Sequence, residues 1–548
     1  MILLSIQGMT SPGCAVQLKD ALDSVDGISK TVVSYEKALI TLMTEGAVSV
    51  EKLIDVINTL GYVASELNHP KSFDSNQDEN ESSKSVNVAI IGSGSGAFAC
   101  AIKAAEGGAK VTMIESAEVI GGCCVNVGCV PSKILIRAAQ LAQQQRDNPF
   151  SGLPNHSPKL NRALLAEQQS RRVEELRAAK YQNILDNNTA LSLIRGFATF
   201  KNSNTLFILK HDGSTHELHA DKILIASGST PTIPPIDGLI ETPYWTSTEA
   251  LFAKQPPEHL VVIGSSVIAL EIAQAYRRLG SEVTILARHS LLFAQEPLLG
   301  EKLTECFEKE GIRVLNDTQV TRVSYQKVKF TLVTQAGVLV CDQLLISTGR
   351  NANTTQLKLD TVGVNCNEHG EIIVNDRMET NIPGIYAAGD CSNMPKFVYV
   401  AAAAGSRAGI NMIGGDAKLD LSTMPAVIFT DPQVATVGLT EVQARAQGIE
   451  TDSRVLDMEN VPRALANFET DGFIKLVVEK ETGRLLGAQI LAHEGGEVLQ
   501  SAVLAIRQRM TVTELADQLF PYLTMVEGLK LCAQTFHKDV RELSCCAG

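Results

Sequence analysis

The stretch VNVAIIGSGSGAFACAIKAAEGGAKVTMIE, residues 86–115, decides the fold of the largest part of this chain. An unbroken apolar run is followed by the glycine turn Gly92-x-Gly94-x-x-Ala97, by helical spacing, and by a second apolar run that ends at Glu115. The glycines allow a backbone to approach a pyrophosphate at the positive end of a helix, and the terminal carboxylate can bond a ribose hydroxyl. This order predicts a Rossmann-like dinucleotide-binding domain.

A second stretch, HLVVIGSSVIALEIAQAYRRLGSEVTILAR at residues 259–288, repeats the order of strand, turn, helix and strand. Its turn contains Gly264 and Ser266, and Arg288 comes directly after the position that aligns with Glu115. The acid that would repel a 2′-phosphate is missing and a cation stands beside the gap, so we expect NADPH here. A merely solvated Arg288 is the alternative. Two dinucleotide sites imply electron transfer between cofactors, one of them a flavin.

Composition narrows the class of protein. The 548 residues are 45% apolar and 20% charged, which is typical of a globular protein. The formal net charge of −13 argues against a nucleic-acid partner. No apolar run is long enough to span a membrane and no signal-peptide pattern opens the chain, so we expect a cytoplasmic protein. Twelve cysteines in such a chain indicate redox or metal chemistry.

The pattern of strands, helices and linkers predicts an α/β protein with several domains. A small unit reads as βαββαβ, the order of a ferredoxin-like fold, and a polar stretch without large apolar residues follows it. Two Rossmann-like domains and an α+β C-terminal domain complete the chain. The predicted boundaries are 1–67 for the small unit, 68–85 for a flexible linker, 86–240 and 346–423 for the two parts of the FAD-binding domain, 241–345 for the NADPH-binding domain, and 424–548 for a dimerisation domain with a Cys-Cys tail.

A cysteine motif, GGCCVNVGCVPSK, follows the first stretch directly. Cys124 and Cys129 are five positions apart, so on one helical turn both sulfurs can lie on the same face. A nearby helix N-terminus and Lys133 would lower the pKa of such thiols. The pair is therefore expected to be redox-active.

With ASGS at 226–229, STGR at 347–350 and YAAGD at 386–390, this motif resembles the pyridine nucleotide-disulphide oxidoreductases over residues 86–548. The resemblance implies FAD at the first turn, NADPH at the second, and a homodimer with active sites at the subunit interface. It places Cys129 against the flavin and lets Cys124 exchange with substrate. It further implies Lys133 paired with Glu271 at the reactive edge of the flavin, Asp390 on the ribityl chain near Val398, Gly349 as another cofactor contact, and Ala117, Ala198 and the backbone of Cys123 on the adenosine side. Members usually carry Thr at position 123, so Cys123 is a departure.

The segment FPYLTMVE, residues 520–527, bears on the substrate. Members that reduce organic disulfides carry a His-Pro here with a Glu seven residues after the His, and the His shuttles a proton to the leaving thiol. This chain keeps Glu527 but has Phe520, and a phenyl ring cannot accept a proton. Reduction of a metal ion needs no such shuttle.

The tail ends in SCCAG, with Cys545 and Cys546 adjacent. Neighbouring cysteines make a strained disulfide at best, and soft thiolates select soft metals. With TPYWTSTEAL and FPYLTMVEGLKL, this tail resembles the mercuric-ion-reducing members of the family. That resemblance makes thiol-bound mercuric ion the expected substrate, with Cys545 and Cys546 passing it to Cys124 and Cys129, and with Tyr244 and Tyr522 flanking it. Ordinary packing of the tyrosines and an unordered tail are the alternatives.

The first unit resembles heavy-metal-associated domains, which carry G-M-T-C-x-x-C before the first helix. Here Ser11 replaces the first cysteine and Cys14 remains. A two-thiolate site cannot form within the loop, although Cys14 could bind metal with a second thiol from elsewhere. A relic domain that no longer delivers metal is the alternative.

Two rival functions stay open. One is reduction of an organic disulfide of the lipoamide or glutathione type, against which Phe520 weighs. The other is non-enzymatic metal buffering by the thiols, against which the two nucleotide sites weigh. A transient contact with a mercury transporter is a further expectation.

Overall fold

The computed structural model describes residues 2–7, 9, 12–25, 27–34, 39–44, 48–66 and 85–542. They fall into two compact units, Met1–Lys84 and Ser85–Gly548. The predicted linker, apart from Ser85, lies outside the described residues.

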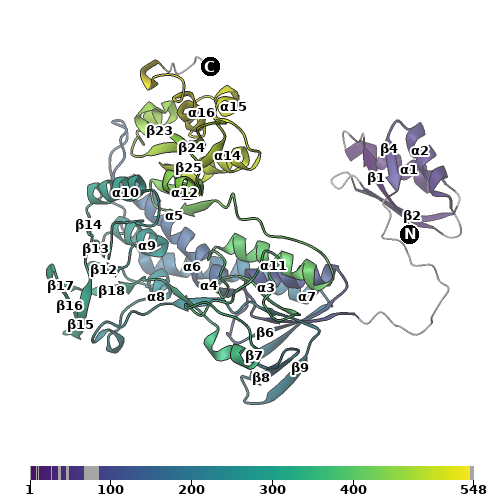
Figure 1. The fold of residues 1–548 in the computed structure, drawn as a ribbon, viewed down its shortest axis with the longest axis horizontal. Coiled ribbons are helices and arrows are strands. Elements are labelled where there is room, and N and C mark those ends of the chain that lie inside the picture. Colours follow the sequence, from purple (N-terminus) through teal and green to yellow (C-terminus); the bar gives the residue numbers. More distant parts are fainter. Residues whose placement is uncertain are drawn as a thin grey trace. The chain divides into compact units, whose positions relative to one another are not determined.

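The first unit has the βαββαβ order that the sequence predicts, and this part of the fold class is confirmed (Figure 1). Its antiparallel sheet has the order β2-β3-β1-β4. Apolar side chains from the sheet and from both helices form its core, because each element presents one apolar face inward. The elements are β1 (Ile2–Gln7), α1 (Pro12–Asp23), β2 (Ile28–Ser34), β3 (Leu39–Thr44), α2 (Val50–Thr59) and β4 (Val63–Glu66).

A seven-stranded sheet lies at the centre of the first nucleotide-binding part, in the order β20-β10-β5-β6-β7-β8-β9. The strands from β20 to β7 run parallel, and β7, β8 and β9 form an antiparallel meander. β5 is buried on both faces, which explains its continuous apolar run. The strands are β5 (Asn87–Ile91), β6 (Lys110–Glu115), β7 (Leu191–Asn202), β8 (Thr205–Lys210), β9 (Thr215–His219), β10 (Lys222–Ile225) and β20 (Ile385–Ala387).

Helices accompany this sheet, and two of them pack with their backbones in contact. A β-carbon on Gly405 of α11 would lie 2.0 Å from the carbonyl oxygen of Gly96 in α3, so these helices approach more closely than side chains would allow. The helices are α3 (Ser95–Glu106), α4 (Gly122–Val127), α5 (Cys129–Arg146), α6 (Arg162–Arg177), a π-helical turn (Ala178–Gln182), α7 (Asn183–Asn187) and α11 (Val398–Met412).

A four-stranded parallel sheet in the order β14-β13-β12-β18 forms the second nucleotide-binding part, beside an antiparallel sheet of β15, β16 and β17. The predicted pair of Rossmann-like domains is thus confirmed. The elements are α8 (Ser247–Phe252), β12 (His259–Ile263), α9 (Val267–Arg278), β13 (Glu282–Leu286), α10 (Pro297–Lys309), β14 (Ile312–Leu315), β15 (Val320–Gln326), β16 (Lys329–Thr334), β17 (Gly337–Cys341) and β18 (Gln343–Ile346).

A two-stranded antiparallel ribbon joins the two nucleotide-binding parts. It consists of β11 (Ser229–Pro231) and β19 (Arg350–Ala352), and Pro231 is the register partner of Arg350. The chain therefore leaves the first part and returns to it at the same place.

The C-terminal part is built on a five-stranded antiparallel sheet in the order β21-β22-β25-β24-β23, with helices on it, as the α+β prediction requires (Figure 1). The elements are β21 (Ala426–Ile428), β22 (Gln433–Gly438), α12 (Glu441–Ala446), β23 (Thr451–Asp457), α13 (Pro462–Asn467), β24 (Phe473–Glu479), β25 (Leu485–Ala492), α14 (Gly495–Arg507), α15 (Val512–Asp517) and α16 (Glu527–Gln534).

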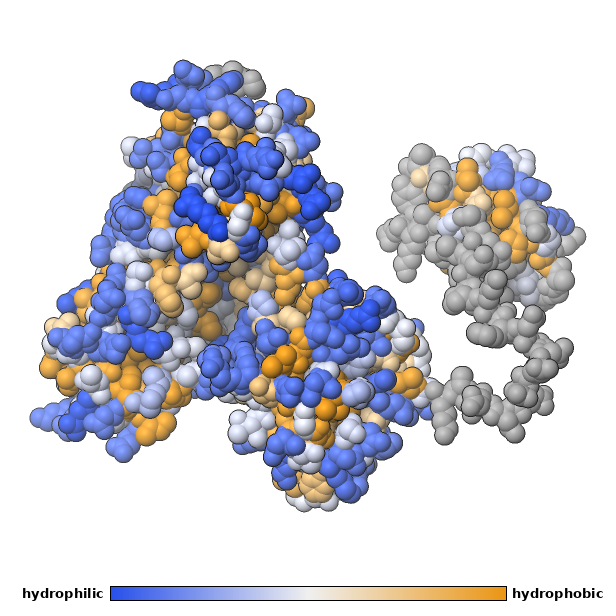
Figure 2. Space-filling model, viewed as in Figure 1, coloured by the Kyte–Doolittle hydropathy of each residue, from blue (hydrophilic) through white to orange (hydrophobic). Residues whose placement is uncertain are grey.

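The surface of the second unit mixes charge with scattered apolar residues. Figure 2 shows hydrophilic residues over much of the outside of this unit, with hydrophobic residues between them. Among the helices that the structure describes, none combines the length and apolar content needed to cross a lipid bilayer.

Candidate active site

The first glycine turn connects β5 to α3 and leaves no space for side chains. Gly92 has a φ of +111°, and a β-carbon there would lie 2.3 Å from the carbonyl oxygen of Ala226. Gly94 is the N-cap of α3, and Ala97 is buried in the first turn of that helix. Because the first N–H groups of a helix have no intrahelical partners, this bare turn fits a pyrophosphate.

Glu115 lies at the end of β6 beside this turn, with 9% of its surface exposed. Its Oε2 accepts a hydrogen bond from the Ser93 hydroxyl at 2.5 Å, and its Oε1 accepts one from the N–H of Ala117 at 2.7 Å. The carboxylate is thus held in one orientation at the turn. Ala198 is buried on the neighbouring strand β7. The ribose and adenosine contacts expected of these residues stay predictions.

Asp390, which follows β20, belongs to a polar network with Ser229 and Arg350. The Ser229 hydroxyl donates to Oδ2 of Asp390 at 2.7 Å, and Nε of Arg350 donates to the Ser229 hydroxyl at 2.7 Å. Nη2 of Arg350 also lies 3.7 Å from Sγ of Cys123. The sequence predicts a cofactor contact through the backbone of Cys123 and adds its thiol as a third one that could oxidise or bind metal, and in the structure this thiol faces Arg350. Val398 is the first residue of α11.

The second glycine turn repeats the geometry of the first. Gly264 has a φ of +128°, and a β-carbon there would lie 2.1 Å from the carbonyl oxygen of Ser347. Ser266 is the N-cap of α9, and Arg288 is exposed after β13. Within residues 85–542, no carboxylate lies at ion-pair distance from Arg288, so its charge is available to a phosphate. Gly349, with a φ of +127°, accepts a hydrogen bond from the N–H of Thr232 at its carbonyl oxygen.

Cys124 and Cys129 lie on two consecutive helices, and the expectation that one helical turn carries both was wrong. α4 ends at Val127, and Gly128 breaks the helix with φ −130° and ψ −113°. Pro131 explains the break, because proline has no N–H for an i−4 bond and is tolerated only in the first turn of a helix. Cys129 therefore becomes the first residue of the 18-residue helix α5. The positive end of that helix stabilises a thiolate there.

As thiols, Cys124 and Cys129 share a hydrogen bond. A hydrogen bond from Cys124 lowers the pKa of Cys129 to about 7, and the ammonium of Lys133 favours the same thiolate. The same hydrogen bond raises the pKa of Cys124, together with burial. The pair therefore loses its first proton near neutral pH, and the thiolate forms on Cys129.

Lys133 is one turn beyond Cys129 on α5 and is held from two sides. Its Nζ lies 2.8 Å from Oε2 of Glu271, a carboxylate with a side chain only 4% exposed. It also lies 4.3 Å from the centre of the Phe429 ring. The other Glu271 oxygen accepts a hydrogen bond from the N–H of Phe429 at 3.0 Å. α5, α9 and the C-terminal part thus meet at this ammonium.

The two tyrosines expected to flank a metal lie in loops of different parts of the second unit. Tyr244 is half-buried against the apolar cluster around β12 and β18. Tyr522 is 52% exposed between α15 and α16 in the C-terminal part. In the same segment, Phe520 packs against the core of that part, and the buried Glu527 accepts a hydrogen bond from the N–H of Leu523. A metal contact of either tyrosine stays a prediction.

In the first unit, Cys14 lies on α1, half-buried against the core. A hydrogen bond with Cys14 raises the pKa of Tyr62. Ser11, Cys545 and Cys546 lie outside the described residues, so the expectations for the metal loop and for the tail are untested.

Sequence reasoning missed three residues near the site. Phe429 carries no local signal, and Arg350 stands in the STGR motif but was assigned no role. Tyr181 lies in the π-helical turn, a rare conformation that is frequent at functional sites. Its hydroxyl lies 3.3 Å from that of Ser95 at the start of α3, and its ring packs edge-on against Phe98.

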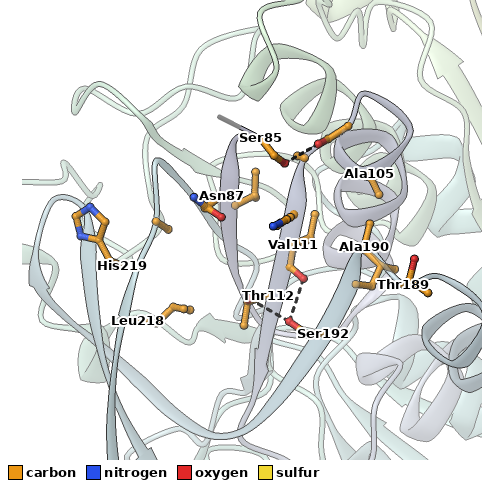
Figure 3. A pocket seen from close by; sticks show the side chains of 16 residues that line it. Ser85, Asn87, Ala105, Val111, Thr112, Thr189, Ala190, Ser192, Leu218 and His219 are labelled. Carbon is orange, nitrogen blue, oxygen red and sulfur yellow. Dashed lines mark hydrogen bonds between the residues drawn. The ribbon is translucent and has the colours of Figure 1, made fainter. Parts of the chain in front are cut away.

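A separate cavity of about 530 Å³ lies at the amino ends of the central strands, away from the glycine turns that follow their carboxyl ends (Figure 3). Asn87 and Lys110, the first residues of β5 and β6, help to line it. In Figure 3 the Ser192 hydroxyl donates to Thr112 and to the carbonyl of Val111. Open α/β sheets bind their ligands beyond the carboxyl ends of the strands, where the glycine turns lie. We therefore do not place a nucleotide in this cavity.

Comparison with known proteins assigns most of this chain to one family. Residues 86–405 match the pyridine nucleotide-disulphide oxidoreductase model, residues 424–533 match the dimerisation domain of the same family, and residues 3–62 match the heavy-metal-associated domain. Among solved structures, the HOCl-induced flavoprotein disulfide reductase RclA from Escherichia coli has 28% identity and a TM-score of 0.74, covering 82% of this chain and 100% of that one. LpdA from Mycobacterium tuberculosis has 26% identity and a TM-score of 0.74, with 83% and 100% covered.

Full-length relatives agree with these matches. Proteins named mercuric reductase are 74% identical in Shewanella putrefaciens, with 100% of both chains covered, and 54% identical in Acidithiobacillus ferrooxidans, with 100% of this chain and 98% of that one covered. A mercuric reductase from Shigella flexneri is 52% identical, again with 100% of both chains covered. The two glycine turns, the coupled thiols and these matches together show that the chain belongs to the pyridine nucleotide-disulphide oxidoreductase family.

Proposed function

We propose that this chain reduces thiol-bound mercuric ion to elemental mercury, with NADPH as the electron source and FAD as the carrier, and so detoxifies mercury. Full-length relatives named mercuric reductase support the activity. Within the site, the observation that carries the choice of substrate is Phe520. Phe520 packs against the core of the C-terminal part, and its phenyl ring cannot shuttle the proton that reduction of an organic disulfide requires.

Family membership gives the chain a flavin and a pyridine nucleotide. We assign FAD to the turn of Gly92 and Gly94, and NADPH to the turn of Gly264 and Ser266. Arg288 is exposed and, within residues 85–542, has no carboxylate at ion-pair distance, which supports the phosphorylated nucleotide. Bound there, NADPH would supply hydride and FAD would supply two-electron transfer to the thiol side.

The protein's own groups prepare the thiols to bind the metal. Cys129 carries the thiolate because Cys124, the start of α5 and Lys133 all favour the charged form. A two-coordinate mercuric ion arrives with carrier thiols, and each protein thiol that replaces one of them transfers its proton to the departing thiolate. We assign the first exchange to Cys124, since Cys129 is held by Lys133 and the helix start.

Glu527 has a different role from its counterpart in a disulfide reductase. Burial raises the pKa of this carboxyl, and its Oε2 accepts the N–H of Leu523. Leu523 has a φ of +58°, so the contact holds a strained turn between α15 and α16. The carboxylate therefore positions the loop of Phe520 and Tyr522.

The match of residues 424–533 to the dimerisation domain supports a homodimer. We propose that the tail thiols Cys545 and Cys546 of one subunit capture the ion for the thiol pair of the other, with Tyr244 and Tyr522 beside it. The role of Cys14, the domain boundaries and a transient contact with a mercury transporter stay predictions.

One assay tests the proposal. NADPH oxidation is followed anaerobically, with excess small thiol, in the presence of mercuric salt, of lipoamide-type or glutathione-type disulfides, or of neither. Oxidation driven by the mercuric salt, with release of volatile mercury, is expected. Oxidation driven by a disulfide alone would refute the metal as substrate, and metal binding without oxidation would indicate a buffering protein.

A further inference from the structure

One face of α9 forms hydrogen bonds with the loop between β21 and β22, the first loop of the C-terminal part. Glu271, Gln274 and Arg278 are three and four positions apart, so their side chains lie on the same side of the helix. All three bind the segment Phe429–Asp431, which connects β21 to β22. This contact joins the helix that begins at the second glycine turn to the part that matches a dimerisation domain.

Gln274 makes the central contact of this face, because it binds both backbone groups of one residue. Its Oε1 accepts the N–H of Asp431 at 2.8 Å, and its Nε2 donates to the carbonyl oxygen of Asp431 at 2.8 Å. Nε2 also donates to Oε1 of Glu310 at 2.8 Å. Only an amide side chain offers a donor and an acceptor in this arrangement. At 3% exposure, the groups it satisfies have little access to water.

Arg278 and His493 close the far end of the contact. Arg278 donates to Oδ2 of Asp431 at 2.8 Å and to both carboxylate oxygens of Glu310, at 2.5 Å and 3.0 Å. His493 lies 3.3 Å from the other Asp431 oxygen. The segment is therefore fixed along its length and not at a single point.

The near end of the same segment reaches Lys133. Phe429 donates its N–H to Glu271, and its ring lies under the Lys133 ammonium. The ring that packs on the ammonium belongs to the segment, and the Glu271 carboxylate on α9 is oriented by the N–H of the same segment. A shift of the segment would move Lys133 away from the thiolate side of α5.

We propose that Gln274 is a positioning residue, which locks Phe429–Asp431 onto α9 and thereby places Lys133 beside Cys129 and the first nucleotide site. This inference rests on the proposed function in one respect, namely that Lys133 and Cys129 act at the flavin. Gln274 itself touches neither nucleotide nor substrate in this scheme.

The test uses the full-length flavin-loaded protein and the variant Gln274→Met, which keeps the length of the side chain and removes its three hydrogen bonds, two to Asp431 and one to Glu310. Flavin reduction by NADPH is measured by anaerobic stopped flow without mercury. The rate constant is expected to fall on the order of tenfold, since small misplacements at a reacting centre are costly. The matched control is Gln169→Met, another buried glutamine, which lines a cavity together with Lys133 but donates to the carbonyl oxygen of Leu251 and not to the Phe429–Asp431 segment. It should leave the rate constant unchanged.

A double-variant cycle separates positioning from general damage. Lys133→Gln slows the same step, and adding Gln274→Met to it should produce no further loss, because the two residues act through one ammonium. The second readout is the long-wavelength absorbance of the Cys124→Ala protein, which reports a Cys129 thiolate against the flavin. Gln274→Met should diminish that band, and Gln169→Met should not.

Three results would overturn the inference: an unchanged rate constant in Gln274→Met, an equal loss in Gln169→Met, or fully additive losses with Lys133→Gln. If Gln274→Met does not fold, Gln274→Asn keeps the amide on a side chain one methylene shorter, which weakens the contact with Asp431 without placing a charge beside Glu310. An intermediate rate constant is then expected, and a wild-type value would contradict the two-sided contact. Failure of the wild-type protein to turn over mercury would refute the proposed function instead, because the measured step uses no metal.

Discussion

Replacing Lys133 by Gln should raise the pKa of Cys129 by about one unit. Cys129 and Lys133 are four positions apart on α5, which brings their β-carbons to about 5–6 Å. Two unit charges about 6 Å apart at an effective dielectric constant of about 20 interact by roughly 3 kcal/mol, or roughly two pKa units. The Lys133 side chain is 36% exposed and paired with Glu271, so screening and the opposing carboxylate reduce this by about half.

The sign follows from the charge. A cation favours the thiolate, so its removal raises the pKa of Cys129 above the value of about 7 that it has beside Cys124 and Lys133. At pH 7 the thiolate fraction then falls from about one half to about one tenth, which is on the order of a fivefold change.

The assay is the pH dependence of iodoacetamide alkylation of the reduced protein, with the modified cysteine located by fragment-ion mass spectrometry. Lys133→Arg keeps the charge and should keep the wild-type midpoint. Arg137→Gln removes an exposed cation one turn further along α5 and should also leave the midpoint in place. A midpoint for Lys133→Gln that coincides with the wild type would refute the electrostatic account of this site.

Three further predictions concern the cofactors and the tail. Gly92→Ala should abolish flavin retention, because its β-carbon would meet the carbonyl oxygen of Ala226 at 2.3 Å; a purified variant with full flavin absorbance would contradict this. Arg288→Ala should raise the KM for NADPH at least on the order of tenfold and leave that for NADH nearly unchanged, since only the 2′-phosphate needs the cation; parallel changes in steady-state kinetics would argue against a phosphate contact. Changing both Cys545 and Cys546 to Ala should slow turnover of thiol-bound mercury and spare flavin reduction by NADPH; equal turnover of wild type and variant would remove the proposed role of the tail.

The sequence predicts the parts of this site that depend on local chain geometry. Gly92 and Gly264 mark turns that only glycine can form, so the two nucleotide folds could be recognised from short stretches. The spacing of the two cysteines is compatible with one helix but does not require it, so the sequence did not predict the break at Gly128. Pro131 is the local signal that could have indicated this break.

The rest of the site depends on contacts between distant segments. Phe429 and Gln274 approach Lys133 only after α5, α9 and the loop after β21 have packed, and nothing in their own neighbourhoods in the chain indicates it. The contact of Cys123 with Arg350 likewise joins two motifs that were read separately. Periodicity and spacing report neighbours along the chain, whereas these positions are set by tertiary packing.

The ribbon of β11 and β19 makes the pyridine-nucleotide part a single continuous insertion in the first nucleotide-binding part. Because Pro231 and Arg350 are partners across two short strands, the chain between them begins and ends at one point. A tight turn in its place would leave the central sheet with its strand order and its glycine turn intact. Excision would also remove α9 with Glu271 and Gln274, so a foreign nucleotide module inserted at the ribbon would connect the same thiols to a different source of electrons only if it supplied its own contacts to Lys133 and to the Phe429–Asp431 segment.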